Sequence, residues 1–163
     1  MTDELKVGSA APDFHALAVG GDYGPGREVA LKDFQGSALV LYFYPKDDTP
    51  GCTVQACGLR DAWGEIKERA TVFGVSIDPA ESHTRFIAKY HLPFPLLSDP
   101  EHRMATAYGV WIEKNLYGRK SMGVERSTFV IDPSGRLAAI FRKVKPDEHV
   151  DLLKDALPAG AKK

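Results

Sequence analysis

One apolar segment constrains the fold more than any other part of this 163-residue chain. Residues 38–44 form the nearly continuous run Ala-Leu-Val-Leu-Tyr-Phe-Tyr, which is rich in residues that favour strands. Apolar runs without alternation are typical of strands buried on both faces of a sheet. The run is far shorter than the ~20 residues that a membrane span requires. We therefore expect a central strand of an α/β fold at this position and no membrane partner.

Strand and helix patterns alternate on either side of this segment. The glycine-rich stretch 18–28 predicts the turn of an N-terminal β-hairpin, and a final helix is expected near the C-terminus. The remaining expected elements are a helix over 53–69, strands over 71–77 and 95–97, helices opening at Asp78-Pro79 and Asp99-Pro100, and a hairpin formed by 127–131 and 137–141. This order predicts an α/β sandwich in which helices flank a central mixed sheet.

The first of these helices has an apolar pattern that suggests which side faces the core. Val54, Leu59 and Ile66 are expected to point inward together with Ala62 and Trp63. For the next helix, Asp78 is expected to be the N-cap and Pro79 the first helical residue. Both predictions assume regular helices that begin at the signals in the sequence.

Length and charge narrow the class of protein. The length fits a single domain over residues 1–163, with a core over about 7–157 and a frayed tail at 158–163. Lys and Arg total 21 against 22 Asp and Glu, which gives no electrostatic reason to expect a nucleic-acid partner. The N-terminus lacks the basic and apolar regions of a signal peptide, so we expect a cytoplasmic protein.

The chain has two cysteines, Cys52 and Cys57. Two are too few for a disulfide-rich secreted scaffold or a four-cysteine zinc site. The five histidines have no metal-ligand spacing, and no glycine-rich dinucleotide or phosphate loop follows a strand, so we expect neither a metal nor a cofactor. In a reducing compartment, a close pair of cysteines indicates catalysis or redox sensing more than a structural bridge.

Cys52 follows the central strand and is expected in the first turn of a helix, with Thr49 as the N-cap and Pro50 as the first helical residue. Unpaired backbone N–H groups and the helix dipole at such a position favour the thiolate over the thiol. The carboxyl edge of an α/β sheet is also where such folds place their ligands. Cys52 is therefore the candidate nucleophile, and the alternative is an inert buried thiol.

Cys57 lies five positions further along the same expected helix. That spacing places the two Cα atoms roughly 8–9 Å apart in a regular helix. A disulfide requires about 4.4–6.8 Å. A Cys52–Cys57 bond is therefore possible only if the first turns of the helix unwind, which suits a reversible switch. The alternative is that Cys57 is only a core residue of the helix.

Three positions at this site resemble a known signature. Pro45-x-x-x-Thr49-x-x-Cys52 is similar to the active-site motif of the peroxiredoxins, and the wider stretch 42–61 resembles the bacterioferritin-comigratory or Q-type subfamily. Further matches are Leu97-Ser-Asp99, Tyr108-Gly-Val-Trp111 and Arg126-Ser-Thr-Phe-Val-Ile-Asp132. The resemblance covers about residues 7–157 and implies a thioredoxin-like fold.

The resemblance also implies a role for each of five residues. Cys52 is expected to attack a hydroperoxide and become a sulfenic acid, which Cys57 resolves as an intramolecular disulfide. Thr49 and Arg126 are expected to hold the thiolate and polarise the peroxide, and Pro45 to shield the site from water. The implied substrates are hydrogen peroxide and organic hydroperoxides. Thioredoxin or a similar thiol reductant is the implied electron donor, and a monomer is expected.

Two other functions are compatible with the same residues. The protein could be a redox sensor in which the disulfide alters partner binding, or a one-cysteine peroxidase in which Cys57 is inert. Asp47 and Asp48 lie beside the nucleophile, and acids disfavour a thiolate. If Cys52 is catalytic, both carboxylates are expected to face solvent.

Overall fold

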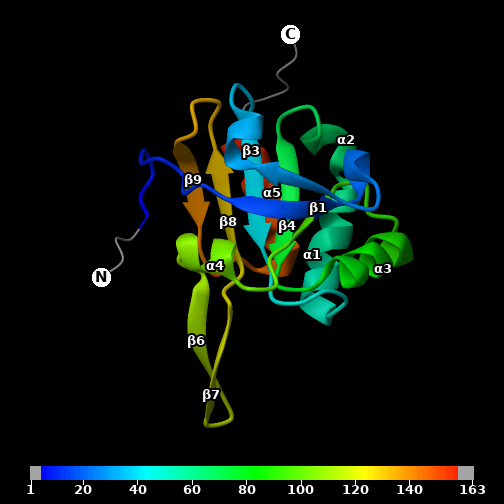
Figure 1. The fold of residues 1–163 in the computed structure, drawn as a ribbon, viewed down its shortest axis with the longest axis vertical. Coiled ribbons are helices and arrows are strands. Elements are labelled where there is room, and N and C mark those ends of the chain that lie inside the picture. The colour runs from blue at the N-terminus through cyan, green and yellow to red at the C-terminus, as the bar shows by residue number, and fades with distance from the viewer. Residues whose placement is uncertain (1–4, 158–163) are drawn as a thin grey trace.

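The structure of the protein is a computed structural model, which describes residues 5–157. Its framework is a seven-stranded sheet in the order β2-β1-β5-β4-β3-β8-β9 (Figure 1). The strands are β1 His15–Val19, β2 Arg27–Ala30, β3 Leu39–Phe43, β4 Thr71–Ser76, β5 Leu96–Ser98, β8 Ser127–Ile131 and β9 Leu137–Phe141. β3 is parallel to β4 and antiparallel to β8, which confirms the predicted mixed sheet. The predicted N-terminal hairpin is the antiparallel pair β1–β2.

The central strand β3 supplies both faces of the sheet with apolar side chains. Leu39, Leu41 and Phe43 belong to one core cluster, and Val40 and Tyr42 belong to the other. Because successive side chains of a strand point to opposite faces, burial of both faces requires a run without polar interruption. This explains why the most apolar segment of the sequence lies in the middle of the sheet.

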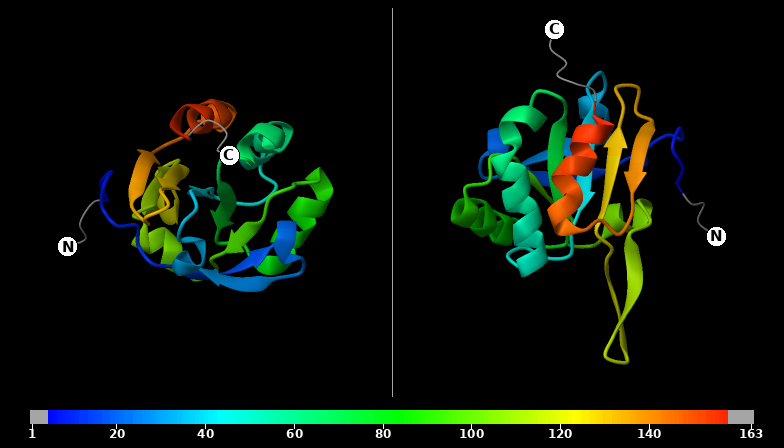
Figure 2. Two further views of the ribbon diagram at one scale, coloured as in Figure 1. Left: turned by 90° about the horizontal axis from the view of Figure 1, so that it is seen from above. Right: turned by 180° about the vertical axis from the view of Figure 1, so that it is seen from behind.

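Helices cover the sheet on both sides. They are α1 Pro50–Asp61, α2 Trp63–Ile66, α3 Ala80–Tyr90, α4 Arg103–Ala107 and α5 His149–Ala156, with 3-10 turns at Gly21–Tyr23, Leu31–Phe34 and Pro146–Glu148. α1 and α5 lie side by side against one face, while α4 supplies apolar residues to the opposite core (Figure 2). The result is the α/β sandwich expected from the order of elements.

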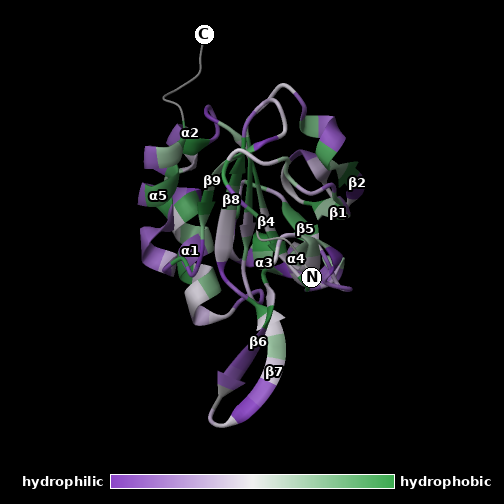
Figure 3. Cartoon of the chain, turned by 90° about the vertical axis from the view of Figure 1, so that its left-hand side faces the viewer, coloured by the Kyte–Doolittle hydropathy of each residue, from purple (hydrophilic) through white to green (hydrophobic). Residues whose placement is uncertain are grey.

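A second, two-stranded sheet was not expected from the sequence. β6 Trp111–Leu116 pairs with β7 Arg119–Val124, and the hairpin projects from the end of the main sheet at which α1 begins (Figures 1 and 2). Away from its base the hairpin is largely hydrophilic (Figure 3). Because most of its side chains pack against nothing, the burial periodicity that marks strands in a sequence is absent there.

Several predicted helix features are wrong in detail. The helix expected over 53–69 is divided into α1 and α2 at Ala62, whose ψ of 7° departs from helical geometry. Val54 is 51% exposed, whereas Leu59 and Ile66 are buried as expected. In α3 the N-cap is Pro79, because the Asp78 carboxylate accepts hydrogen bonds from Ser76 and Asp47 instead of capping the helix.

Within the described residues, no helix is both long and apolar enough to span a bilayer. The tail predicted at 158–163 lies outside the described residues.

Candidate active site

Cys52 lies where the central strand ends and α1 begins. Thr49 is the N-cap with extended backbone angles, Pro50 is the first helical residue, and Cys52 is in the first turn, as predicted. The side chain of Cys52 is buried, with 1% of the residue exposed. The thiol is therefore held at the positive end of a helix and away from bulk water.

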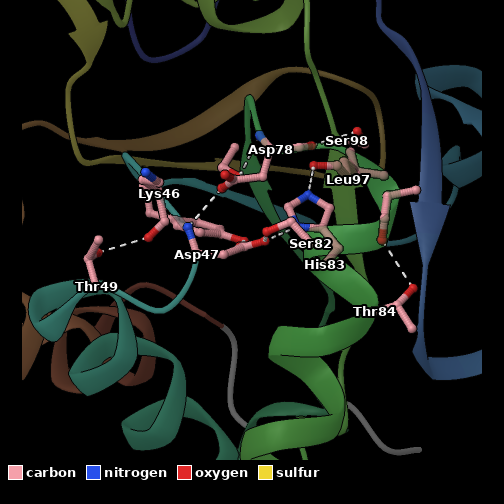
Figure 4. Close-up of polar contacts among 12 residues, drawn as sticks. Lys46, Asp47, Thr49, Asp78, Ser82, His83, Thr84, Leu97 and Ser98 are labelled. Carbon is pink, nitrogen blue, oxygen red and sulfur yellow. Dashed lines mark hydrogen bonds and ion pairs between the residues drawn. The ribbon is translucent and has the colours of Figure 1, made fainter.

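The Thr49 hydroxyl does not cap the helix. It donates a hydrogen bond to the carbonyl of Lys46 across 2.8 Å, which closes the loop between β3 and α1 (Figure 4). Its oxygen can still accept a hydrogen bond from a bound molecule. Pro45 is partly buried at the start of the same loop, so both residues belong to the segment that leads to Cys52.

Arg126 brings a permanent positive charge to the sulfur. Its Nη1 lies 3.5 Å from Cys52 Sγ and donates a 2.7 Å hydrogen bond to Gln55 Oε1. β8 is antiparallel to β3, with Ser127 opposite Phe43, so the residue before β8 necessarily lies at the carboxyl end of β3. The sheet topology thus joins two residues that are far apart in the sequence.

Two neighbours of Arg126 were missed in the sequence. Gln55 is fully buried and follows Cys52 by three positions, so both lie on the same face of α1. A Cβ on Gly51 would lie 3.0 Å from Arg126 Nη2, so glycine provides the space in which the guanidinium rests. One feature of the sequence could have identified Gln55. It is a polar residue one helical turn after the nucleophile, and a regular helix places that position on the side that faces the core.

Asp47 contradicts the expectation that both acids beside the nucleophile face solvent. It is 7% exposed, and its carboxylate accepts hydrogen bonds from Tyr44, Ser82 and His83 at 2.6, 2.7 and 2.8 Å (Figure 4). Three donors compensate for the burial of the charge. Asp47 thereby ties the loop before Cys52 to α3.

Asp48 does face solvent, as expected. Its carboxylate accepts hydrogen bonds from Lys89 Nζ and the Tyr90 hydroxyl, each at 2.8 Å. These two bonds lower the pKa of Asp48 below its ordinary value. Both acids of the loop are thus paired with donors, which lie on α3 except for Tyr44, the residue after β3.

Asp47, Asp78 and His83 form a buried cluster whose potential ligand atoms all lie within 4.8 Å of one another. His83 Nε2 donates to the Leu97 carbonyl at 2.9 Å, and Asp78 accepts from the Asp47 backbone N–H at 2.8 Å. Both carboxylate oxygens of Asp47 and Oδ2 of Asp78 already accept protein hydrogen bonds. The chemistry of the cluster is therefore that of a hydrogen-bond network that positions the loop.

Cys57 is a free, partly buried thiol on α1, and Cys52 is also free. The two belong to one continuous helix, as the sequence predicted for the reduced protein. A disulfide between them requires the first turns of α1 to open.

Comparisons with known proteins agree with this geometry. The model of the AhpC/TSA family matches residues 7–140. Peroxiredoxin Bcp of Bacillus subtilis is 48% identical over 147 residues, which cover 90% of this chain and 90% of that protein. The chain belongs to the AhpC/TSA family. It is a peroxiredoxin of the Bcp/PrxQ type, and therefore a peroxidase with a thioredoxin-like fold.

Solved structures of the same type resemble this peroxiredoxin closely. A PrxQ variant of Xylella fastidiosa has a TM-score of 0.84 at 32% identity and covers 94% of this chain and 96% of its own. The bacterioferritin comigratory protein of Xanthomonas campestris has a TM-score of 0.78 at 35% identity, covering 93% and 95%. That structure was described in connection with alkyl peroxide reduction.

Proposed function

We propose that this peroxiredoxin reduces hydrogen peroxide and organic hydroperoxides with Cys52 as the nucleophile and Cys57 as the resolving thiol. The observation that carries the proposal is the approach of Arg126 to the buried sulfur of Cys52 at the first turn of α1. A cation and a helix N-terminus together stabilise a thiolate and the negative charge that develops on a departing oxygen.

In the first step, the Cys52 thiolate attacks one oxygen of the hydroperoxide and the O–O bond breaks. Cys52 becomes a sulfenic acid, and the other oxygen leaves as alkoxide or hydroxide and takes up a proton to give an alcohol or water. Arg126 stabilises the leaving oxygen, the Thr49 hydroxyl orients the peroxide, and Pro45 limits the access of water. Gln55 holds the guanidinium in place through its 2.7 Å hydrogen bond.

In the second step, the Cys57 thiol attacks the sulfenic sulfur and water leaves, forming a disulfide. α1 must unwind to bring the two sulfurs together. An external dithiol of the thioredoxin type then reduces the bond by thiol–disulfide exchange, and α1 folds again. The cycle needs no metal, no cofactor and no second subunit, so we propose that the chain works as a monomer.

The experiment is stopped-flow oxidation of the reduced protein by hydrogen peroxide, followed by turnover with thioredoxin. Cys52→Ser should abolish the fast oxidation, whereas Cys57→Ser should retain it and lose thioredoxin-dependent turnover. Full turnover of Cys57→Ser would instead indicate the one-cysteine mechanism. A wild-type oxidation rate no greater than that of free cysteine would overturn the peroxidase assignment and favour a redox sensor.

A further inference from the structure

The part of α1 that carries both cysteines buries little apolar surface. Over residues 50–57 the buried side chains are those of Cys52, Gln55 and Ala56. Val54, the largest aliphatic residue of this stretch, is 51% exposed. Segments with few buried apolar contacts open at a lower cost in free energy than the rest of a fold. Residues 50–57 are therefore the part of α1 that opens most readily.

The last turn of α1 is anchored to the rest of the domain. Leu59 is fully buried in the core cluster between α1 and the sheet. Arg60 Nη1 donates a 2.8 Å hydrogen bond to the backbone carbonyl of the last residue of α3. The carbonyl of Gly58 accepts a 3.2 Å hydrogen bond from the N–H of Ala62, so it belongs to this anchored turn. An opening of α1 that frees Cys57 must therefore end at Gly58.

Within residues 5–157, packing does not require a glycine at position 58. The φ of Gly58 lies outside the left-handed region, and a Cβ there would lie 3.8 Å from Val150 Cγ2, which is an ordinary van der Waals contact. The other glycine of α1 differs, because a Cβ on Gly51 would lie 3.0 Å from Arg126 Nη2. Glycine inside a helix is less favourable than alanine, since its backbone loses more freedom on folding. Gly58 thus weakens α1 without meeting a steric need.

We infer that Gly58 is the hinge at which α1 opens when Cys57 resolves the sulfenic acid of Cys52. The inference rests on the proposed function. In that step the sulfur of Cys57 bonds to the sulfur of Cys52 and the S–O bond breaks, so that the hydroxyl group leaves as water with the proton of the thiol. Gly58 absorbs the change in backbone angles between the opened segment and the anchored turn. It therefore sets the rate of resolution and does not affect the attack on the peroxide.

The first measurement is hydrogen–deuterium exchange of the reduced protein, which reports the opening of α1 without any peroxide. Gly58→Ala should slow exchange at the amides of residues 54–57 about fivefold, because alanine favours the helical form. This effect requires residue 58 to leave the helical conformation when the segment opens. An alanine that stayed helical throughout would change nothing.

Gly64→Ala is the matched control. It makes the same substitution at an exposed position of α2, where a Cβ meets nothing within 4 Å. It should leave exchange over residues 54–57 unchanged, and thermal melts should show that both variants are folded.

The second measurement is the rate of disulfide formation after oxidation. The reduced protein is mixed with equimolar hydrogen peroxide and quenched in acid at intervals, and the intact mass separates the sulfenic acid from the disulfide. Gly58→Ala should slow disulfide formation about fivefold, whereas its rate constant for oxidation of Cys52 should stay within about twofold of the wild type. Gly58→Asn also adds a Cβ but favours a helix less than alanine, so it should slow disulfide formation only about twofold.

Unchanged exchange in Gly58→Ala would overturn the inference, and so would slower exchange with an unchanged rate of disulfide formation. An equal effect of Gly64→Ala would overturn it as well, since the response would then reflect overall stability. A wild-type protein in which Cys52 is not oxidised, or in which Cys57 forms no disulfide, would contradict the proposed function itself. The exchange experiment needs neither reaction, which makes the two failures distinguishable.

Discussion

Arg126 Nη1 lies 3.5 Å from Cys52 Sγ, although 74 positions separate the two residues. The contact exists because β8 is paired with β3 and places its first residue at the end of the strand that leads to Cys52. Catalytic geometry in this protein therefore depends on the pairing of two central strands. A site built on such strands is held more rigidly than one built on loops alone.

Replacement of Arg126 should slow oxidation of Cys52. Arg126→Gln removes the charge beside the sulfur and the donor for the leaving oxygen, so the second-order rate constant with hydrogen peroxide should fall about 100-fold. The measurement is stopped-flow oxidation of the reduced variant. Arg136→Gln, on an exposed arginine of the β8–β9 turn, is the control and should match the wild type. An Arg126→Gln rate within threefold of the wild type would remove Arg126 from the mechanism.

Asp47 and Asp48 are neighbours with different energetic roles. Asp47→Ala leaves two buried donors, Tyr44 and His83, and the part-buried Ser82 without an acceptor, and should lower the free energy of unfolding by about 3 kcal/mol. Asp48→Ala removes only solvent-exposed bonds and should lower stability far less. Urea denaturation of the two variants compares them directly. Equal stability of both variants would show that the Asp47 network contributes no more than the exposed bonds of Asp48.

The sequence predicted the structure correctly where neighbouring residues alone determine the local fold. The run at 38–44 identified the central strand, because burial on both faces leaves a continuous apolar signature. Thr49, Pro50 and Cys52 occupy their predicted places, because a proline at the first helical position fixes where α1 begins. The spacing of Cys52 and Cys57 predicted two separate thiols on one helix, because the distance between two residues of a regular helix depends only on how many positions separate them.

The sequence was uninformative where partners come from distant segments. Asp47 was expected in solvent, because nothing local shows that Ser82 and His83 of α3 surround it. The β6–β7 hairpin carries no burial pattern, so the sequence did not predict it. Val54 was expected in the core, but the side of α1 that faces the sheet carries Gln55 instead.

Gly74 should tolerate no side chain. A Cβ there would lie 2.7 Å from Tyr42 Cζ and 2.8 Å from Leu96 Cδ2, both within the core. Gly74→Ala should therefore lower the free energy of unfolding by about 2 kcal/mol, measured in urea. Gly64→Ala is the control, because a Cβ at that helical position meets nothing within 4 Å. The control should be as stable as the wild type or slightly more so. A stable Gly74→Ala protein would mean that Tyr42 repacks freely.

His149 should make stability depend on pH. Burial, with a smaller contribution from Arg126, lowers the pKa of His149 from 6.5 to about 3. Between pH 6.5 and about 3 the ring of His149 stays neutral in the folded protein, whereas in the unfolded chain it binds a proton near pH 6.5. Unfolding therefore takes up a proton below pH 6.5, so the stability of the folded state falls as the pH falls toward 3.

The measurement is the free energy of unfolding in urea at pH 7, 6 and 5 for the wild type and for His149→Leu. Between pH 7 and 5 the wild type should lose about 2 kcal/mol more than the variant, which has no titrating group at this position. Parallel curves for wild type and His149→Leu would show that His149 binds its proton equally well in the folded and the unfolded protein, which would contradict the lowered pKa.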